Sequence, residues 1–301
     1  MTEIRDVYPL SSHMSLPEGV AFDAKTRRFF ATGLMGGQLI EIDAATGAER
    51  VFYSYAGPVQ LSGAKVDDQR RRLWVCVSDI SGPRGGLDVF DVDSGALLQH
   101  FELARGGICN DVCLDGDGVA YVTDSFLPVI YRVDARDGSA GEFIRDAQMT
   151  PPPGAFGLNG VVVTPDGRYL IGGFTTPSKL FIASIKDPQG VREIALDGDP
   201  FAVPNDPQFT GADGIVFIGD VLYVVNDGGV QRVTFTAPDY SAGRVKSVHA
   251  PEAGLTTATV VDGELYVIKA EVVRAMHMRL PPNLPFKIYR FPRSLFEADA
   301  E

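Results

Sequence analysis

The chain lacks the features that mark several large classes of protein. No stretch approaches the roughly 20 consecutive apolar residues that a membrane-spanning helix requires, so no membrane partner is expected. Basic residues are also scarce, because 27 Lys and Arg stand against 39 Asp and Glu, a formal net charge of -12. Proteins bind nucleic acid through positive charge, and this balance therefore argues against a nucleic-acid partner.

Cysteine is equally scarce. The chain contains Cys76, Cys109 and Cys113, an odd set without paired spacing, which predicts reduced thiols in place of a disulfide framework. No Asn lies in an Asn-X-Ser/Thr sequon, and residues 1–10 contain no apolar signal-peptide core. Together these absences favour a cytoplasmic protein.

A short repeated phrase is the most informative feature that is present. Its copies begin with the following residues, roughly 43 to 54 positions apart: Glu18, Ser62, Asn110, Asn159, Asp213 and Thr256. Each copy is followed by a polar turn and a β-rich run such as Leu-Trp-Val-Cys-Val. This period is typical of propeller blades, and we find no convincing amphipathic helix. The sequence predicts an all-β, six-bladed β-propeller in which residues 1–301 form one domain.

The expected strands follow from the repeat. In the first blade they lie near 18–23, 28–32, 38–43 and 49–54. The next four blades span about 62–103, 110–145, 159–196 and 213–249. The sixth has strands near 256–261, 265–270 and 287–291 but lacks an outer strand. Because a propeller must hide its edges, we expect the β-prone segment 3–10 to close the ring by pairing with the strand 286–291.

Equivalent positions of the blades should meet at the central axis. Four of the six repeats start with an oxygen ligand, namely Glu18, Asn110, Asn159 and Asp213. Two carboxylates and two amides suit calcium, which prefers hard oxygen ligands, although zinc or manganese could also bind. The alternative is that these residues only line a wet channel. The sequence favours a metal site in the central channel, with the small hydroxyls of Ser62 and Thr256 leaving room for substrate or water.

Three long loops are expected on the same face as the metal. They are 145–158, which contains Phe156, 197–212, and 270–286, which contains Met276, His277 and Met278. Long loops on a rigid scaffold are where functional residues concentrate. We therefore expect Phe156 and His277 to contact a small-molecule substrate.

The motifs around the four expected ligands resemble those of the regucalcin and gluconolactonase superfamily. The motifs are Leu16-Pro-Glu18-Gly, Cys109-Asn110-Asp111, Gly157-Leu-Asn159-Gly160-Val and Gly211-Ala-Asp213-Gly214. The resemblance covers nearly the whole chain and implies a six-bladed propeller with one catalytic divalent cation, similar in architecture to diisopropylfluorophosphatase and paraoxonase. It implies that Glu18, Asn159 and Asp213 bind the metal directly, with Asn110 a fourth ligand or a substrate contact.

One departure from this pattern concerns the substrate. The sugar-lactone enzymes usually carry an arginine two residues before the Asn of the third blade, and this chain has Ile108. The resemblance then implies a metal-dependent hydrolase that opens a lactone or ester less polar than gluconolactone. A phosphotriesterase-like hydrolase and a non-catalytic propeller that binds calcium or a small ligand stay open as alternatives, whereas strictosidine-synthase-like condensation is disfavoured by the intact metal set.

The catalytic residue is expected to be Asp213, because a carboxylate at the metal can orient the attacking water as a base or attack the substrate directly as a nucleophile. A carboxylate bound to a dication is a weaker base, so His277, His13 or bulk solvent are alternatives. Asp124, which ends a second strand, is expected to be a substrate contact or a turn cap. Cys109 is expected to be a small buried apolar residue, with a nucleophilic role as the alternative.

Overall fold

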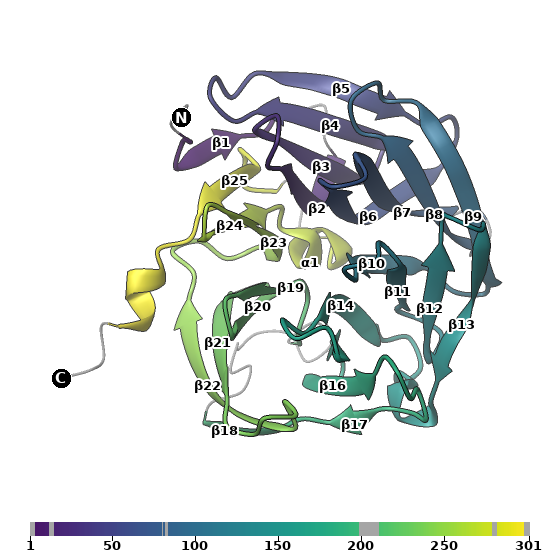
Figure 1. Cartoon of the computed structure of the whole chain (residues 1–301). Helices are drawn as coiled ribbons and strands as arrows, with labels where there is room; N and C mark the ends of the chain where they lie inside the picture. The colour runs from purple at the N-terminus through teal and green to yellow at the C-terminus, as the bar shows by residue number, and fades with distance from the viewer. Residues whose placement is uncertain are drawn as a thin grey trace.

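The computed structural model describes residues 4–11, 15–79, 81, 84–198, 211–278 and 282–297. Its strands form six sheets that surround one axis like the blades of a propeller (Figure 1). The prediction of an all-β, six-bladed propeller is confirmed. No helix among these residues is long and apolar enough to cross a membrane.

The first three blades each contain four antiparallel strands. The first blade contains β2 (Ser15–Asp23), β3 (Arg28–Met35), β4 (Gln38–Asp43) and β5 (Glu49–Ser54). The second contains β6 (Val59–Asp67), β7 (Arg72–Asp79), β8 (Arg84–Asp91) and β9 (Leu97–Arg105). The third contains β10 (Cys109–Leu114), β11 (Ala120–Asp124), β12 (Val129–Asp134) and β13 (Ser139–Arg145), followed by the 3-10 helix η1 (Ala147–Met149).

The last three blades are less regular. The fourth contains β14 (Leu158–Val163), β15 (Tyr169–Phe174), β16 (Lys179–Ser184) and the short β17 (Arg192–Glu193). The fifth contains β19 (Ile215–Ile218), β20 (Val221–Asn226), β21 (Gly229–Phe235) and β22 (Ala242–His249). The sixth contains β23 (Leu255–Val261), β24 (Glu264–Lys269) and β25 (Lys287–Arg290), with α1 (Val272–Met276) in the β24–β25 loop and the 3-10 helix η2 (Arg293–Phe296) after β25.

The outer edge of the fourth blade differs from the sequence prediction. We expected this blade to extend to residue 196, but its chain leaves the sheet after β17. The next strand, β18 (Ala195–Gly198), pairs in parallel with β22 and becomes a fifth strand of the next blade. This crossing links the two blades through backbone hydrogen bonds.

Alternation along each strand explains how the sheets pack. In β7, Trp74 and Cys76 contact the third blade, whereas Leu73, Val75 and Val77 contact the first. Successive side chains of a strand point to opposite faces, and a sheet between two neighbours must be apolar on both. A continuous apolar run such as residues 73–77 is therefore what a strand buried on both faces requires. An apolar cluster of this kind lies between each pair of adjacent blades.

The N-terminal strand closes the ring, as predicted. The strand β1 (Val7–Pro9) pairs with β25, with Val7 opposite Tyr289, so that the N-terminus completes the sixth blade (Figure 1). Tyr8 is buried, and its hydroxyl donates to the backbone oxygen of Ala44 in the first blade at 2.7 Å. The closing strand thus connects the last blade to the first.

Candidate functional site

A pocket lies at the axis of the propeller, and all four residues expected to bind metal line it: Glu18, Asn110, Asn159 and Asp213. The small hydroxyl residues Ser62 and Thr256 line it as well. Its volume of about 70 Å³ is room for several water molecules, or for a cation and the reacting end of a small molecule. The repeat therefore placed equivalent positions of six blades correctly around one cavity.

A bulge in the inner strand directs these side chains toward the axis. In five blades the pairing with the second strand shifts at the repeat-start position, between Pro17 and Val20, Leu61 and Ala64, Cys109 and Val112, Leu158 and Val161, and Leu255 and Ala258. A bulge places an extra residue in one strand and changes the direction of its side chain. Repetition of the same bulge explains why residues far apart in sequence meet in the pocket.

Glycine follows several of the repeat-start residues for a packing reason. A β-carbon on Gly19 would collide with the backbone oxygen of Ser62, and one on Gly160 would collide with that of Asp213. Only glycine lets the inner strands of neighbouring blades approach so closely. These glycines therefore let the inner strands converge at the axis.

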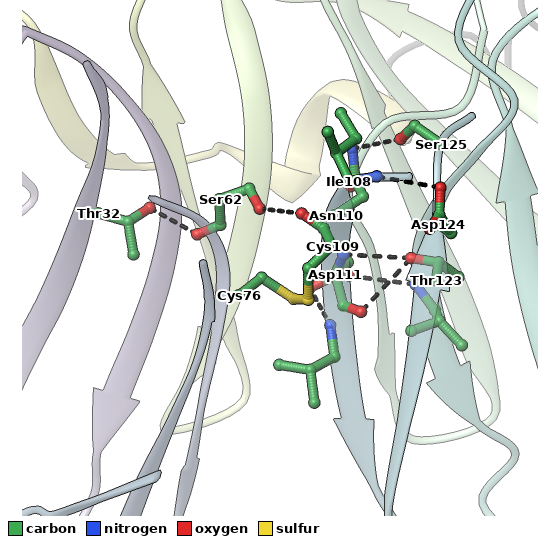
Figure 2. Close-up of a disulfide and its surroundings, with 12 residues drawn as sticks. Thr32, Ser62, Cys76, Ile108, Cys109, Asn110, Asp111, Thr123, Asp124 and Ser125 are labelled. Atoms are coloured by element: carbon green, nitrogen blue, oxygen red, sulfur yellow. Dashed lines mark hydrogen bonds between the residues drawn. A yellow bond between two sulfur atoms is a disulfide. The ribbon is translucent and has the colours of Figure 1, made fainter. Parts of the chain in front are cut away.

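Hydrogen bonds connect the six blades into a closed ring around the axis. Four of these bonds come from side-chain hydroxyls, which donate to backbone oxygens: Thr32 to Ser62 (2.6 Å), Ser62 to Cys109 (2.7 Å), Thr123 to Asn159 (2.5 Å) and Thr256 to Glu18 (2.8 Å). The other two come from backbone amides, Gly160 to the oxygen of Asp213 and Gly214 to the oxygen of Thr256, both at 3.0 Å. Figure 2 shows the bonds from Thr32 to Ser62 and from Ser62 to Cys109. Each accepting carbonyl belongs to the next blade, so the ring fixes the positions of the pocket residues relative to one another.

The orientation of Asn110 follows from its partner. Ser125 donates its only hydroxyl hydrogen to the oxygen of Leu158 at 2.8 Å, so it accepts from the side-chain nitrogen of Asn110, also at 2.8 Å. Asn159 is held in the same way, because its nitrogen donates to the hydroxyl of Thr175 at 3.2 Å. Both side-chain nitrogens are thereby engaged, and the amide oxygens are left for other partners.

Two buried oxygens of the pocket have no hydrogen-bond partner among the described residues. They are Oε2 of Glu18 and Oδ1 of Asn110. A buried carboxylate or amide oxygen without a partner is costly, and a cation that binds it removes that cost. These oxygens fit a divalent metal ion.

The electrostatics of the pocket also favour a bound cation. Burial and the negative charges of Asp213 and Asp111 raise the pKa of Glu18 well above its usual value. Burial and the charge of Asp111 likewise raise the pKa of Asp213, against a hydrogen bond from Asn159 that lowers it. None of the described residues lining this pocket is Lys or Arg. A cation would supply the positive charge that this group of carboxylates lacks.

The chemistry of the donor set limits which metals fit. Within the described part of the chain, no group of three or more His, Cys, Asp or Glu side chains is placed to hold a metal ion. A metal in this pocket would therefore depend on the amide oxygens of Asn110 and Asn159 in addition to the carboxylates of Glu18 and Asp213. An all-oxygen set of this kind suits calcium and disfavours a structural zinc site.

Apart from the four residues expected to bind metal, the wall of the pocket is mainly apolar. The apolar residues are Leu34, Ile108, Phe156, Val272, Val273 and Met276, and the polar ones include Gln60 and Asp227. Ile108 and Phe156 thus line the pocket, and their contact with a substrate stays a prediction. Gln60 was missed, although it precedes Ser62 by two residues, as Ile108 precedes Asn110, and the same alternation along a strand could have identified it.

Two expected substrate contacts lie elsewhere. Asp124 does not line the pocket, because its buried carboxylate accepts hydrogen bonds from the amides of Phe126 and Leu127, both at 2.9 Å, and of Ile108 at 3.2 Å. Asp124 therefore caps the turn at 126–127 and holds the backbone of Ile108 through a hydrogen bond. His277 follows the last residue of α1 and is also absent from the lining, whereas Met276 is present. His13 falls outside the described residues.

The cysteines differ from the expectation that all three are reduced thiols. Cys76 of β7 and Cys109 of β10 form a disulfide that joins the second and third blades, with their Cα atoms 5.2 Å apart (Figure 2). Cys113 is buried and unpaired, and burial raises the pKa of its thiol. The prediction of reduced thiols is therefore wrong for this pair, and Cys109 is no free nucleophile. One of the arguments for a cytoplasmic location is removed, because disulfides persist mainly in oxidising compartments.

Solved structures share this architecture, although neither the family models nor the curated sequences that we searched match the chain. The major allergen Mala s 1 of Malassezia sympodialis has a TM-score of 0.77 and 16% identity, over 97% of both chains. A gluconolactonase from Xanthomonas campestris has a TM-score of 0.65 and 18% identity, over 95% of this chain and 89% of its own. The calcium-binding protein regucalcin from Agrobacterium tumefaciens has a TM-score of 0.66 and 18% identity, over 96% and 95%. The resemblance predicted from the four motifs is confirmed at the level of the fold, which this chain shares with gluconolactonase and regucalcin.

Proposed function

We propose that this protein is a divalent-metal-dependent hydrolase that opens a lactone or a similar ester less polar than gluconolactone. The observation that carries this proposal is one pocket lined by the buried carboxylate of Glu18, the half-buried carboxylate of Asp213, two oriented amides and several apolar side chains. The structural neighbours support the reaction class, because one is a gluconolactonase and another is a calcium-binding protein. Fold alone does not assign an activity, so the proposal depends on the site.

Calcium is the ion that we assign to the pocket, with zinc or manganese as possible substitutes. Glu18, Asn110, Asn159 and Asp213 would hold it through oxygen atoms. When bound, a divalent ion supplies Lewis-acid chemistry, which polarises the ester carbonyl and stabilises the negative charge that develops on its oxygen.

Asp213 is the residue to which we assign the base. It lines the pocket, and a carboxylate in this position can act on a water molecule that enters the pocket. Its carboxylate would orient the attacking water and accept a proton from it. His277 is less suited to this role, because it does not line the pocket.

The apolar wall supports the choice of substrate. Ile108, Phe156 and Met276 can bury an alkyl or aryl group, while the carboxylates below remain available to the reacting ester. No Lys or Arg among the described lining residues is available to bind a polyhydroxylated or anionic substrate. We therefore expect small, weakly polar lactones and esters to be preferred.

A comparative assay tests this proposal. The protein is stripped with EDTA and assayed against alkyl lactones, gluconolactone, aryl esters and phosphotriesters, with and without added calcium, zinc or manganese. We expect hydrolysis of alkyl lactones or aryl esters that EDTA abolishes and calcium restores. Activity that survives complete removal of metal would contradict the metal requirement. Faster phosphotriester hydrolysis would favour that reaction class, and calcium binding without turnover of any substrate would favour a binding propeller.

A further inference from the structure

The β24–β25 loop contributes part of the pocket wall through residues 272–276. Its helix α1 presents Val272, Val273 and Met276 to the cavity, and Figure 1 shows α1 over the centre of the ring. A helix of five residues is too short to be stable alone, so contacts outside it must hold it in place. Buried charged groups at the base of the loop supply such contacts.

Glu271, which directly precedes α1, has an unusual backbone. Its φ angle is 55°, in the left-handed region that disfavours residues other than glycine. Its amide donates to the oxygen of Gly254 at 3.0 Å, and a β-carbon on Gly254 would collide with Glu271. Contacts with Gly254 therefore hold the backbone of Glu271 in this strained conformation. The side chain of Glu271 makes further contacts.

The carboxylate of Glu271 connects the two ends of the loop. It accepts hydrogen bonds from the backbone amide of Asn283 at 2.8 Å and from the side-chain amide of Asn283 at 2.9 Å. It also lies 3.3 Å from the ammonium of Lys269 and 3.5 Å from the guanidinium of Arg274. Glu271 is buried, and hydrogen bonds to a buried carboxylate are stronger than those between neutral groups.

Lys269 also connects the two ends of the loop. Its side chain is 5% exposed, and its ammonium donates to the backbone oxygen of Asn283 at 2.9 Å. Its charge is balanced by Glu271 and, at 3.7 Å, by the more exposed Glu252. Both Glu271 and Lys269 thus bind Asn283, the residue at which the chain returns toward β25.

We propose that Glu271 and Lys269 form a latch that closes the loop at its base and holds α1 over the pocket. In the hydrolase proposed above, on which this inference rests, Glu271 is a positioning residue. It acts through Val273 and Met276, the part of the apolar wall that binds the alkyl or aryl group of the substrate. It does not touch the reacting atoms, so its loss weakens substrate binding more than it slows the chemical step.

The test compares Glu271→Gln with a matched control, Glu252→Gln. The control removes one carboxylate from the exposed rim of the same cluster, where its side chain is 48% exposed and pairs with Lys287. Glu271→Gly is a second variant that is expected to fold, because glycine relieves the left-handed backbone while it removes the carboxylate. Hydrogen exchange of peptides that contain residues 272–278 is measured in all four proteins, with and without calcium.

We expect exchange in residues 272–278 to become about tenfold faster in Glu271→Gln and Glu271→Gly, because loss of the latch opens the loop locally. Glu252→Gln should match the wild type. With p-nitrophenyl butyrate as substrate, KM should rise about tenfold in both Glu271 variants, and kcat should change less than about twofold.

Each contrary result is informative. Unchanged exchange in residues 272–278 would overturn the latch, as would faster exchange spread evenly over all six blades, which would indicate general destabilisation. A fall in kcat at constant KM would overturn the positioning role. If the wild type hydrolyses no ester or lactone, the proposed function fails, whereas the exchange experiment still decides whether Glu271 holds α1.

Discussion

The hydroxyl of Thr256 donates a hydrogen bond of 2.8 Å to the backbone oxygen of Glu18, and this bond joins the last blade to the first at the axis. It completes the ring of hydrogen bonds between the blades. Glu18 is also one of the four oxygen ligands that we assign to the metal. Closure of the propeller and placement of a metal ligand thus depend on the same contact.

We expect Thr256→Val to lower the free energy of unfolding by about 1–2 kcal/mol, because the buried oxygen of Glu18 loses its side-chain donor. Calcium affinity should fall as well, since Glu18 becomes less firmly placed. Urea unfolding and calorimetric titration measure these two effects. Thr234→Val, at an exposed position of β21, is the control and should change neither. Equal stability of wild type and Thr256→Val would show that the closing bond is dispensable.

The disulfide between Cys76 and Cys109 gives a second prediction. Because it closes a loop over a sequence separation of 33 residues, its reduction should lower the free energy of unfolding by about 3–4 kcal/mol. Urea unfolding with and without a dithiol reductant measures this difference. Cys113→Ser, which leaves the disulfide intact, should respond to the reductant as the wild type does. Three titratable thiols in the unreduced, denatured protein, instead of one, would contradict the disulfide.

Much of the fold and of the site could be predicted because a repeat constrains both. A strand buried on both faces must be apolar throughout, as residues 73–77 are, and a fixed period of such strands indicates blades. Once the blades surround one axis, Glu18 and Asp213 must meet, however far apart they lie in the chain. The same logic correctly placed Phe156 on the wall of the pocket.

Contacts that depend on the exact fit between elements could not be predicted. The pairing of Cys76 with Cys109 requires that a second strand and the next inner strand approach to a Cα separation of 5.2 Å, which no spacing in the sequence reveals. Asp124 could equally have faced the pocket or capped a turn, because a strand end permits both. The hydrogen bond between Glu271 and Asn283 was hidden for a similar reason, since the two residues come together only in the folded chain.

The raised pKa values of Glu18 and Asp213 predict how stability depends on pH. A carboxyl group with a raised pKa binds its proton more tightly in the folded state than in the unfolded state. Its favourable contribution is therefore present at low pH and is lost as the pH rises from the unfolded pKa through the folded one. Without metal, raising the pH should destabilise the wild type relative to Glu18→Gln, which cannot ionise at this position.

Calcium should reverse this order, because metal and protons compete for the same oxygens. At pH 8, calcium at a hundredfold excess over Kd should stabilise the wild type by about 2.7 kcal/mol. The same calcium concentration should stabilise it less at pH 5, where protons compete and Kd is higher. Melting curves of both proteins at the two pH values, with EDTA or calcium, measure these differences. A calcium effect that is equal in Glu18→Gln would exclude Glu18 as a ligand.

Asp213→Asn distinguishes a ligand from a catalytic base. If Asp213 only binds metal, the variant should lose calcium affinity, and saturating calcium should restore most of kcat. Because we assign the base to Asp213, we expect kcat to remain roughly 10²-fold low even when calcium is saturating. Occupancy is checked by titration calorimetry before the rates are compared. Asn159→Asp, which changes an expected ligand but keeps Asp213, is the matched control and should retain more activity.

The last prediction concerns substrate choice, which we place in Ile108 and α1 and not in the metal ligands. Ile108 lines the pocket, and its amide donates to the carboxylate of Asp124 at 3.2 Å, which holds its backbone in place. Burial of one methylene group contributes about 0.8 kcal/mol, which corresponds to a rate increase of about fourfold per carbon along a series of alkyl lactones. The increase should stop when the space beside Met276 is filled.

Ile108→Arg should flatten this trend, because a guanidinium replaces apolar surface and can donate hydrogen bonds to hydroxyl groups. The preference should then shift toward gluconolactone. Ile108→Leu keeps both volume and polarity and should preserve the wild-type trend, which separates the effect of charge from that of repacking. Ratios of kcat/KM for matched lactones in the three proteins measure the shift. A wild type that prefers gluconolactone, with no change in Ile108→Arg, would place substrate selection outside this wall of the pocket.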